Sequence, residues 1–171
     1  MAEVKKASAG KRGDKVRSDC FIEIEFTKSG GIESSLLSKV DSMYGQSIND
    51  FIILICDFFE IKNAQITIED FGALPFTIAA RFESALKKIN PEEHREFLPA
   101  MNKVNNYSSS KDKLRRSRLY LPGNEPKFYP NAGLHKPDGI ILDLEDSVAH
   151  SEKNSARYLV RNALRAIEFY G

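Results

Sequence analysis

The spacing of apolar residues predicts alternating strands and helices in the first 90 residues. Large apolar and acidic side chains alternate over residues 20–26, and residues 64–70 alternate similarly, as expected for strands with one solvated face. Residues 32–39 follow a Gly-Gly turn, so we expect a strand that pairs with the first as a hairpin. Apolar residues recur at three- and four-residue steps over residues 40–61, and residues 78–89 resemble a helix as well.

The pattern changes after residue 90. Residues 91–113 carry few large apolar side chains and can scarcely offset the entropy of ordering the chain, so we expect a linker. Beyond it, short apolar runs at residues 117–121 and 139–144 predict two strands, each followed by a turn or helix. The last helix is expected to begin at Ser151 and to run through Ile167.

These elements predict two domains of different class. Residues 1–90 would form an α+β domain with a basic amino-terminal arm, and residues 91–113 the linker. Residues 114–171 would form a truncated α/β segment, because the sequence stops after two strand-to-helix units. We expect the arm to be solvated, although its basic side chains would also suit phosphates: Lys5, Lys6, Lys11, Arg12, Lys15 and Arg17.

Charge and composition exclude several classes of protein. Among 171 residues, 25 are Lys or Arg and 24 are Asp or Glu, so no overall charge favours nucleic acid or an anionic membrane as a partner. The sequence has neither an apolar leader nor an apolar span of about 18 residues. Its cysteines, Cys20 and Cys56, sit among apolar residues and are expected to be buried. We therefore expect a reduced, cytoplasmic protein.

Carboxylates cluster where the second of the later strands ends. Asp143 and Glu145 would share one face of an extended chain, while Asp146 falls opposite them or in the turn. Carboxylates so close together repel one another unless a cation, an arginine or hydrogen-bond donors compensate them. The cluster fits either a magnesium or water-positioning site or a set of capping and loop hydrogen bonds, and the pattern by itself favours the second.

Residues 115–171 contain the motifs RRSRLYLPG, KPD, LDLEDSV and EKxxAR, in this order. By these motifs the segment resembles the amino-terminal end of the citrate lyase beta subunit and its relatives among the HpcH/HpaI aldolases and malyl-coenzyme A lyases. The resemblance implies the first two βα units of a TIM-type (β/α)8 barrel and a magnesium-assisted carbon-carbon cleavage. The family's metal-binding Glu and Asp and its carboxylate-binding Arg lie on later strands, so we expect this chain to be a lyase component that is inactive alone.

Two groups of site residues are carried over from the same resemblance. The first matches the family's acidic motif and would support catalysis near the metal: Asp143, Glu145 and Asp146, of which the last two would contact the metal indirectly. The second matches the wall that faces the cofactor thioester: Tyr120, Pro122, Gly123 and, as a further candidate, Arg116.

The first 90 residues contain Ser-Asp at 18–19, Tyr-Gly at 44–45, EDFGALP at 69–75 and ARFE at 80–83. By these motifs they are similar to the acyl carrier subunits of citrate lyase and of malonate decarboxylase. It implies a serine, here Ser18, to which the cofactor 2′-(5″-triphosphoribosyl)-3′-dephospho-coenzyme A is attached covalently through a phosphodiester. The thioester on this group would visit the lyase, where citryl-thioester yields oxaloacetate and acetyl-thioester. The implied partners are citrate lyase alpha and beta-type subunits, a prosthetic-group transferase and the acyl thioester substrate.

The carrier motif departs from the family at one position. The modified serine of the family usually stands two residues before an aspartate, and counted back from Asp19 that position holds Arg17. Ser18 is one residue off, yet it is the serine that we select. Two alternatives remain open: an unmodified carrier-like module that binds a lyase subunit, or a carrier for another acyl group such as malonyl, citramalyl or malyl.

Overall fold

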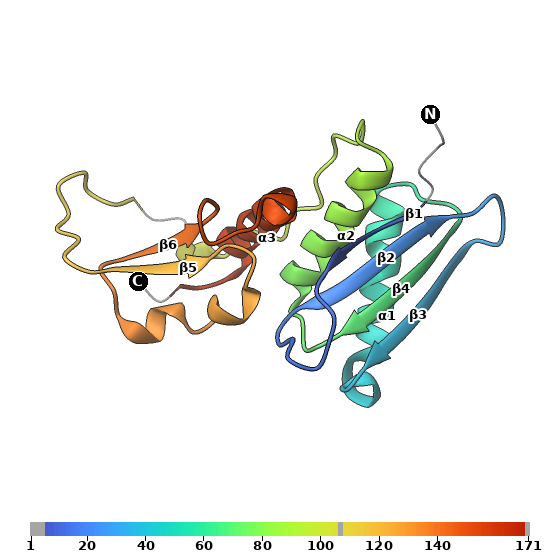
Figure 1. Cartoon of the computed structure of the whole chain (residues 1–171), viewed down its shortest axis with the longest axis horizontal. Helices are drawn as coiled ribbons and strands as arrows, with labels where there is room; N and C mark the ends of the chain where they lie inside the picture. Colours follow the sequence, from blue (N-terminus) through green and yellow to red (C-terminus); the bar gives the residue numbers. More distant parts are fainter. Residues whose placement is uncertain (1–5, 106–107, 170–171) are drawn as a thin grey trace. The chain divides into compact units, whose positions relative to one another are not determined.

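The computed structural model describes residues 6–105 and 108–169, and the chain divides into two compact units between Phe97 and Leu98. In the described residues, the first unit has a four-stranded sheet and two α-helices, and the second a two-stranded sheet and one α-helix (Figure 1). The predicted mixture of strands and helices is therefore confirmed. No helix in these ranges combines the length and apolar character needed to cross a membrane.

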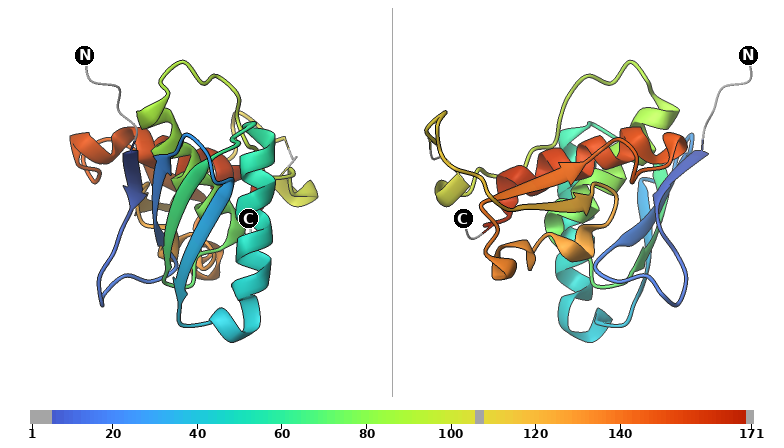
Figure 2. Two further views of the ribbon diagram at one scale, coloured as in Figure 1. Left: turned by 90° about the vertical axis from the view of Figure 1, so that its right-hand side faces the viewer. Right: turned by 60° about the vertical axis from the view of Figure 1, so that its left-hand side comes forward.

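Both helices of the first unit pack on one face of its sheet (Figure 2). The elements are β1 (Lys6–Gly10), β2 (Cys20–Phe26), β3 (Ile32–Ser38), α1 (Asp41–Phe58), β4 (Ala64–Asp70) and α2 (Pro75–Ile89). The sheet has the order β1-β2-β4-β3, in which β2 is antiparallel to both neighbours and β3 runs parallel to β4. Strands β2 and β4 have the predicted bounds.

The core of the first unit lies between this sheet face and the helices. In the register of β2 and β4, Ile22 faces Ile68 and Ile24 faces Ile66, and each is at most 1% exposed. Phe82 of α2 is fully buried in the same cluster. Burial of each such side chain contributes about 1.5–3 kcal/mol, so β2 and β4 are held firmly against the helices.

The predicted hairpin is wrong, because β4 lies between β2 and β3. Strand β4 turns Ala64, Ile66 and Ile68 into the core, whereas β3 exposes Ser34 and Ser35 and takes the edge of the sheet. The more apolar strand gains more from the central position, which the helices cover. Helix α1 then supplies the crossover that the parallel pair of β3 and β4 requires.

The amino-terminal arm is not wholly solvated. Strand β1 pairs antiparallel with β2, and Ala9 joins the core. Lys6 forms ion pairs with Glu23 and Glu25 at 2.8 and 3.3 Å. The arm prediction is therefore wrong for Lys6–Gly10, whose sequence lacks the large alternating apolar residues by which strands are recognised. Lys5 lies outside the described residues.

In the second unit, β5 (Arg118–Pro122) and β6 (Gly139–Asp143) pair in parallel. Helix α3 (Lys153–Ala166) buries Leu159 and Ala163. The 3-10 turns are η1 (Lys103–Asn105), η2 (Pro126–Phe128), η3 (Ala132–His135) and η4 (His150–Glu152). Ser151 was expected to open the last helix; it lies in η4 instead, and no side chain caps α3.

The segment predicted as a linker is divided between the two units. Phe97 packs edge-on against Phe51 and Phe58 of α1, with ring centroids 5.7 and 5.3 Å apart. Farther along, the Asn102 amide donates to the Arg165 carbonyl at 2.7 Å, at the end of α3. Residues on both sides of the unit boundary therefore have packing partners, each within its own unit.

Candidate functional site

The connection between β1 and β2, residues 11–19, carries the candidate attachment serine. It leaves β1 at Gly10, whose φ is +96° and whose close approach to the backbone of Cys20 leaves no room for a side chain. The Lys11 amide donates to the Cys20 carbonyl at 3.2 Å and closes the base of the loop. The chain is thereby returned to the start of β2.

Ser18 has a left-handed backbone conformation with a φ of +55°. Non-glycine residues adopt this conformation where their surroundings hold it. The Ser18 amide donates to the Phe71 carbonyl at 2.9 Å, and the Phe71 amide donates to the Asp19 carbonyl at 3.0 Å. The Ser18 side chain is partly exposed, and its hydroxyl has no hydrogen-bond partner among the described residues. The neighbouring Arg17, at the family's usual serine position, is exposed.

Asp19 is anchored to α2 by a buried ion pair. Arg81 Nε lies 2.9 Å from Asp19 Oδ1, and Arg81 Nη2 lies 2.7 Å from Asp19 Oδ2. The Cys20 amide donates a further hydrogen bond to Asp19 Oδ1 at 2.8 Å. The side chains of Asp19 and Arg81 are 2% and 3% exposed, so the two opposite charges compensate each other away from water.

Asp70 shapes the turn between β4 and α2. This turn meets the end of the β1–β2 connection at Ser18, Asp19 and Phe71, which together we call the Ser18 corner. Its Oδ1 accepts hydrogen bonds from the amides of Gly72 and Ala73 at 3.0 and 2.8 Å. Its Oδ2 accepts one from the Ser38 hydroxyl at 2.7 Å. The aspartate of the EDFGALP motif thus holds the turn that presents Phe71 to Ser18.

The basic loop is also tied to the solvated face of the sheet. Arg12 forms an ion pair with Glu69, and its guanidinium carbon lies 3.8 Å from the centroid of the Phe21 ring. Burial raises the pKa of the adjacent Cys20 thiol well above its usual value, and burial raises the pKa of Cys56 to about 12. Both cysteines are buried as predicted. Ser18, in contrast, is partly exposed.

In the second unit, Asp143 closes β6 with local hydrogen bonds. Its Oδ1 accepts from the Glu145 amide at 2.8 Å and its Oδ2 from the Ser147 amide at 3.1 Å. Hydrogen bonds from Ser147, with those from the backbone amides, lower the pKa of the Asp143 carboxyl. The carboxylate therefore organises its own loop, while Glu145 and Asp146 are exposed.

Gly123 packs directly against the end of β6. Its amide donates to the Asp143 carbonyl at 2.7 Å, and a Cβ at this position would lie 2.5 Å from the same oxygen. Lys153 of α3 donates to the carbonyls of Leu144 and Glu145 at 3.2 and 2.9 Å. The Leu-Pro-Gly end of β5, the end of β6 and the start of α3 therefore meet at one place.

Not all of the predicted lyase residues come together. Pro122 stands opposite Asp143 at the carboxyl end of the strand pair, and Tyr120 is 62% exposed on β5. Arg116 precedes β5 and lies 3.5 Å from Asp138 at the opposite end of the strands. Five residues of strand span roughly 16 Å, so Arg116 is separate from the other candidates.

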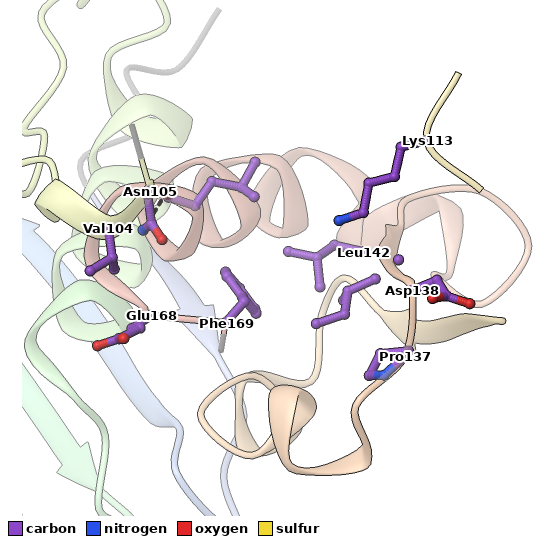
Figure 3. A pocket seen from close by; sticks show the side chains of 11 residues that line it. Val104, Asn105, Lys113, Pro137, Asp138, Leu142, Glu168 and Phe169 are labelled. Carbon is purple, nitrogen blue, oxygen red and sulfur yellow. Dashed lines mark hydrogen bonds between the residues drawn. The ribbon is translucent and has the colours of Figure 1, made fainter. Parts of the chain in front are cut away.

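A cavity of about 550 Å³ lies beside β6 in the second unit (Figure 3). Leu142 and Phe169 line it together with Leu164 of α3, and Asp138 lies at its rim. None of the candidate lyase residues lines it. Among the described residues, no three His, Cys, Asp or Glu side chains are grouped as metal ligands would be.

The comparisons with known proteins divide the chain in the same two parts. Residues 5–89 match the family model of the malonate decarboxylase delta subunit (MdcD). The citrate lyase acyl carrier protein of Treponema denticola is 41% identical over 73 residues, which are 43% of this chain and 82% of that protein. The chain therefore belongs to the citrate lyase acyl carrier protein family. The predicted resemblance of the first 90 residues is confirmed.

The acyl carrier region is followed by residues similar to a lyase. Residues 116–171 match the HpcH/HpaI aldolase/citrate lyase family model. The citrate lyase beta subunit of Leuconostoc mesenteroides is 45% identical over 58 residues, 34% of this chain and 19% of that protein. The beta subunit of Haemophilus influenzae is 53% identical over 53 residues, 31% of this chain and 18% of that protein. The chain thus joins an acyl carrier to a region that spans about a fifth of those beta subunits.

Sequence reasoning missed two residues of the carrier corner. Arg81 and Asp70 were part of matching motifs but received no role of their own. An arginine in an amphipathic helix is ordinarily assigned to the solvated face, and its partner Asp19 is 62 residues away. The ARFE and EDFGALP motifs were the only signals in the sequence that pointed to these positions.

Proposed function

We propose that this chain is the acyl carrier component of a citrate lyase-like system, with the prosthetic group attached at Ser18. The observation that carries the proposal is the accessibility and fixed position of Ser18 at its corner. A partly exposed hydroxyl, free of hydrogen bonds to described residues, is held there by backbone bonds to Phe71. A covalent carrier needs such an attachment point, accessible to the attaching enzyme yet fixed on a folded domain. The partners are then the citrate lyase alpha and beta-type subunits and the prosthetic-group transferase.

The residues at the corner fit attachment of a dephospho-coenzyme A group. For a triphosphoribosyl donor, Ser18 Oγ attacks the phosphorus atom next to the ribose. An O–P bond forms, the bond to the second phosphate breaks, pyrophosphate leaves, and the serine proton passes to a base of the transferase. Once bound, the group supplies a thiol that carries an acyl group as a thioester. The remaining residues of the corner hold the serine and undergo no chemistry.

The second unit is proposed to supply two βα units of a (β/α)8 barrel of the citrate lyase beta type. The parallel pairing of β5 and β6 supports this, as does the position of Asp143 at their carboxyl end, where such barrels place their active sites. Tyr120, Pro122 and Gly123 would then form part of the wall facing the thioester. The whole site would cleave citryl-thioester to oxaloacetate and acetyl-thioester.

The acidic residues of the second unit do not by themselves fit a magnesium ion. Mg²⁺ requires octahedral oxygen ligands, usually including carboxylates. Asp143 is engaged with two backbone amides, and the described residues bring no third acidic or histidine ligand to Glu145 and Asp146. We therefore assign no metal-dependent step to these residues and leave them a supporting role.

Placing the carrier and the lyase segment in one chain has a kinetic consequence. We propose a carrier domain at residues 1–90 and a lyase segment at 114–171. Of the connector between them, residues 91–97 belong to the first unit and residues 98–113 to the second. A short connection keeps a tethered substrate at a high effective concentration, in the millimolar range for flexible linkers. The carried thioester would then reach its lyase without a diffusive encounter.

A second candidate function is an unmodified carrier-like module that binds a lyase subunit. Arg17, at the position where the family usually has its serine, favours this alternative. Such a module would keep the fold of the first unit and would need no reactive hydroxyl.

Loading in vitro distinguishes the two functions. The chain is incubated with a citrate lyase prosthetic-group transferase and its triphosphoribosyl donor, and the mass of the product is measured. We expect one added group on the wild type and on the control Ser29→Ala, whose serine lies in the turn before β3, and none on Ser18→Ala. Loading of Ser18→Ala would contradict the assigned site. Absence of loading on the wild type would favour the unmodified module.

A further inference from the structure

The buried ion pair between Asp19 and Arg81 lies directly beside the candidate attachment serine, Ser18. We propose that Arg81 is a positioning residue, which acts through Asp19 to hold Ser18 in place while the prosthetic group is attached. The inference rests on the proposed function of Ser18 and deepens it, because it assigns a determinant of the attachment rate to a residue on a different element.

The pairing geometry fixes the carboxylate in orientation as well as in position. Two nitrogens of Arg81 meet the two oxygens of Asp19, at 2.9 and 2.7 Å. A planar guanidinium that contacts both oxygens sets the plane of the carboxylate, which a lysine ammonium cannot do. The Cys20 amide, 2.8 Å from Oδ1, adds a third constraint at the first residue of β2.

Stability alone is a poor reason for such a pair. Both side chains are almost fully buried, and the cost of removing two charges from water cancels most of their attraction. Apolar residues of similar volume commonly stabilise a core at least as well. The pair differs from them in giving the backbone at Asp19 one defined orientation.

That orientation is transmitted directly to the attachment residue. Asp19 follows Ser18 in the chain, and the two residues share the hydrogen bonds to Phe71 on the other side of the corner. Ser18 keeps its left-handed conformation between these two anchors. Because a displacement of about 1 Å can cost about 10²-fold in rate, the position of this hydroxyl decides how fast it attacks a bound donor.

The test measures the kinetics of attachment with Asp19→Asn and Arg81→Lys in the full chain. Asp19→Asn removes the charge with little change of shape, and Arg81→Lys keeps a cation but loses the two-point contact. The transferase and its triphosphoribosyl donor are used as above, and kcat and KM for the carrier are determined separately. We expect kcat to fall at least tenfold while KM changes less than about threefold, because docking surfaces are unaltered.

Glu83→Gln is the matched control. Glu83 is a buried acid on the same helix, which pairs with Lys87 at 2.8 Å and accepts a hydrogen bond from the Phe97 amide at 3.3 Å. We expect this variant to lose stability to urea as the test variants do, yet to be loaded at the wild-type rate. Amide hydrogen exchange adds an independent measure: exchange at Ser18 and Phe71 should accelerate at least tenfold in Asp19→Asn and remain unchanged in Glu83→Gln.

The outcomes separate this inference from the proposed function. Normal kcat in both test variants, or an equal fall in Glu83→Gln, would overturn the positioning role while leaving Ser18 as the attachment site. Loss of the folded circular dichroism spectrum in both test variants would also overturn it, because the pair would then be structural. A wild-type chain that takes up no group would instead refute the proposed function, and the positioning role with it.

Discussion

Asp19 in the first unit and Asp143 in the second each hold a corner beside a strand, but they are compensated by different groups. Asp19 is buried and paired with an arginine 62 residues away, on the helix α2 that packs against the sheet. Asp143 is paired with amides two and four residues ahead of it in its own loop. The first corner therefore depends on the tertiary fold, whereas the second is a local structure.

The cores of the two units also differ, because the core of the first is the more enclosed. The first unit encloses one apolar cluster between a four-stranded sheet and two helices, whereas the described part of the second has two strands and an open cavity beside β6. A carrier must hold its attachment point alone while it visits other proteins, so a self-contained core suits it. We expect changes in the first unit to act on its whole fold and changes in the second to act locally.

The largest expected effect comes from the core of the first unit. Phe82→Ala should lower the free energy of unfolding of this unit by about 3–5 kcal/mol, because the side chain is fully buried and stacks on Phe59. Hydrogen exchange of peptides from each unit, measured in urea, reports the loss. Leu54→Ala, at a position 55% exposed on α1, is the control and should change stability by less than about 0.5 kcal/mol. An equal loss of protection in β5 and β6 would contradict the division into separate units.

A smaller effect is expected where β5 ends in the second unit. Gly123→Ala should cost about 1–3 kcal/mol, because the new Cβ would lie 2.5 Å from the Asp143 carbonyl and 2.8 Å from Leu144 Cδ2. The nearest atom to a Cβ at Gly139 is 3.9 Å away, so Gly139→Ala should be nearly neutral. Chemical denaturation of both variants measures their free energies of unfolding. Equal stability of the two variants would show that the contact of Gly123 with β6 is not tight.

The smallest effect is a pH dependence confined to the Asp143 loop. Because hydrogen bonds lower the pKa of Asp143 in the folded state, its stabilising contribution is complete above the unfolded value of about 3.9 and is lost as the pH falls through the lower folded value. Carbon NMR should show Asp143 titrating below that value, together with shifts of the Glu145 and Ser147 amides. Titration at an ordinary pKa, or loss of the first unit in the same transition, would refute the local character of this corner.

The sequence predicted the local elements of the first unit better than their pairing. Strands β2 and β4 were found to the residue, since both alternate over seven positions. The partner of β3 was wrong, because pairing depends on which strand buries more apolar surface. Strand β1 was missed because Lys6–Gly10 contains only small apolar residues.

The candidate site was predictable only in part, for a related reason. Ser18 was selected by resemblance to a known motif, and Asp143 both by its place in a carboxylate cluster at a strand end and by such a resemblance. Neither signal gives the contacts of a residue. The pairing of Asp19 with Arg81 follows from the packing of α2 on the sheet, which no spacing in the sequence encodes. The separation of Arg116 from Asp143 likewise follows from the direction of the strands.

Peptide mass spectrometry of the chain purified from its native host tests the central claim most directly. If the chain is a working acyl carrier, the peptide that contains Ser18 carries a phosphoribosyl-dephospho-coenzyme A group in phosphodiester linkage, and no other serine does. An unmodified Ser18 in cells that express the transferase, or a group on a different residue, would contradict the assignment of Ser18 as the attachment site.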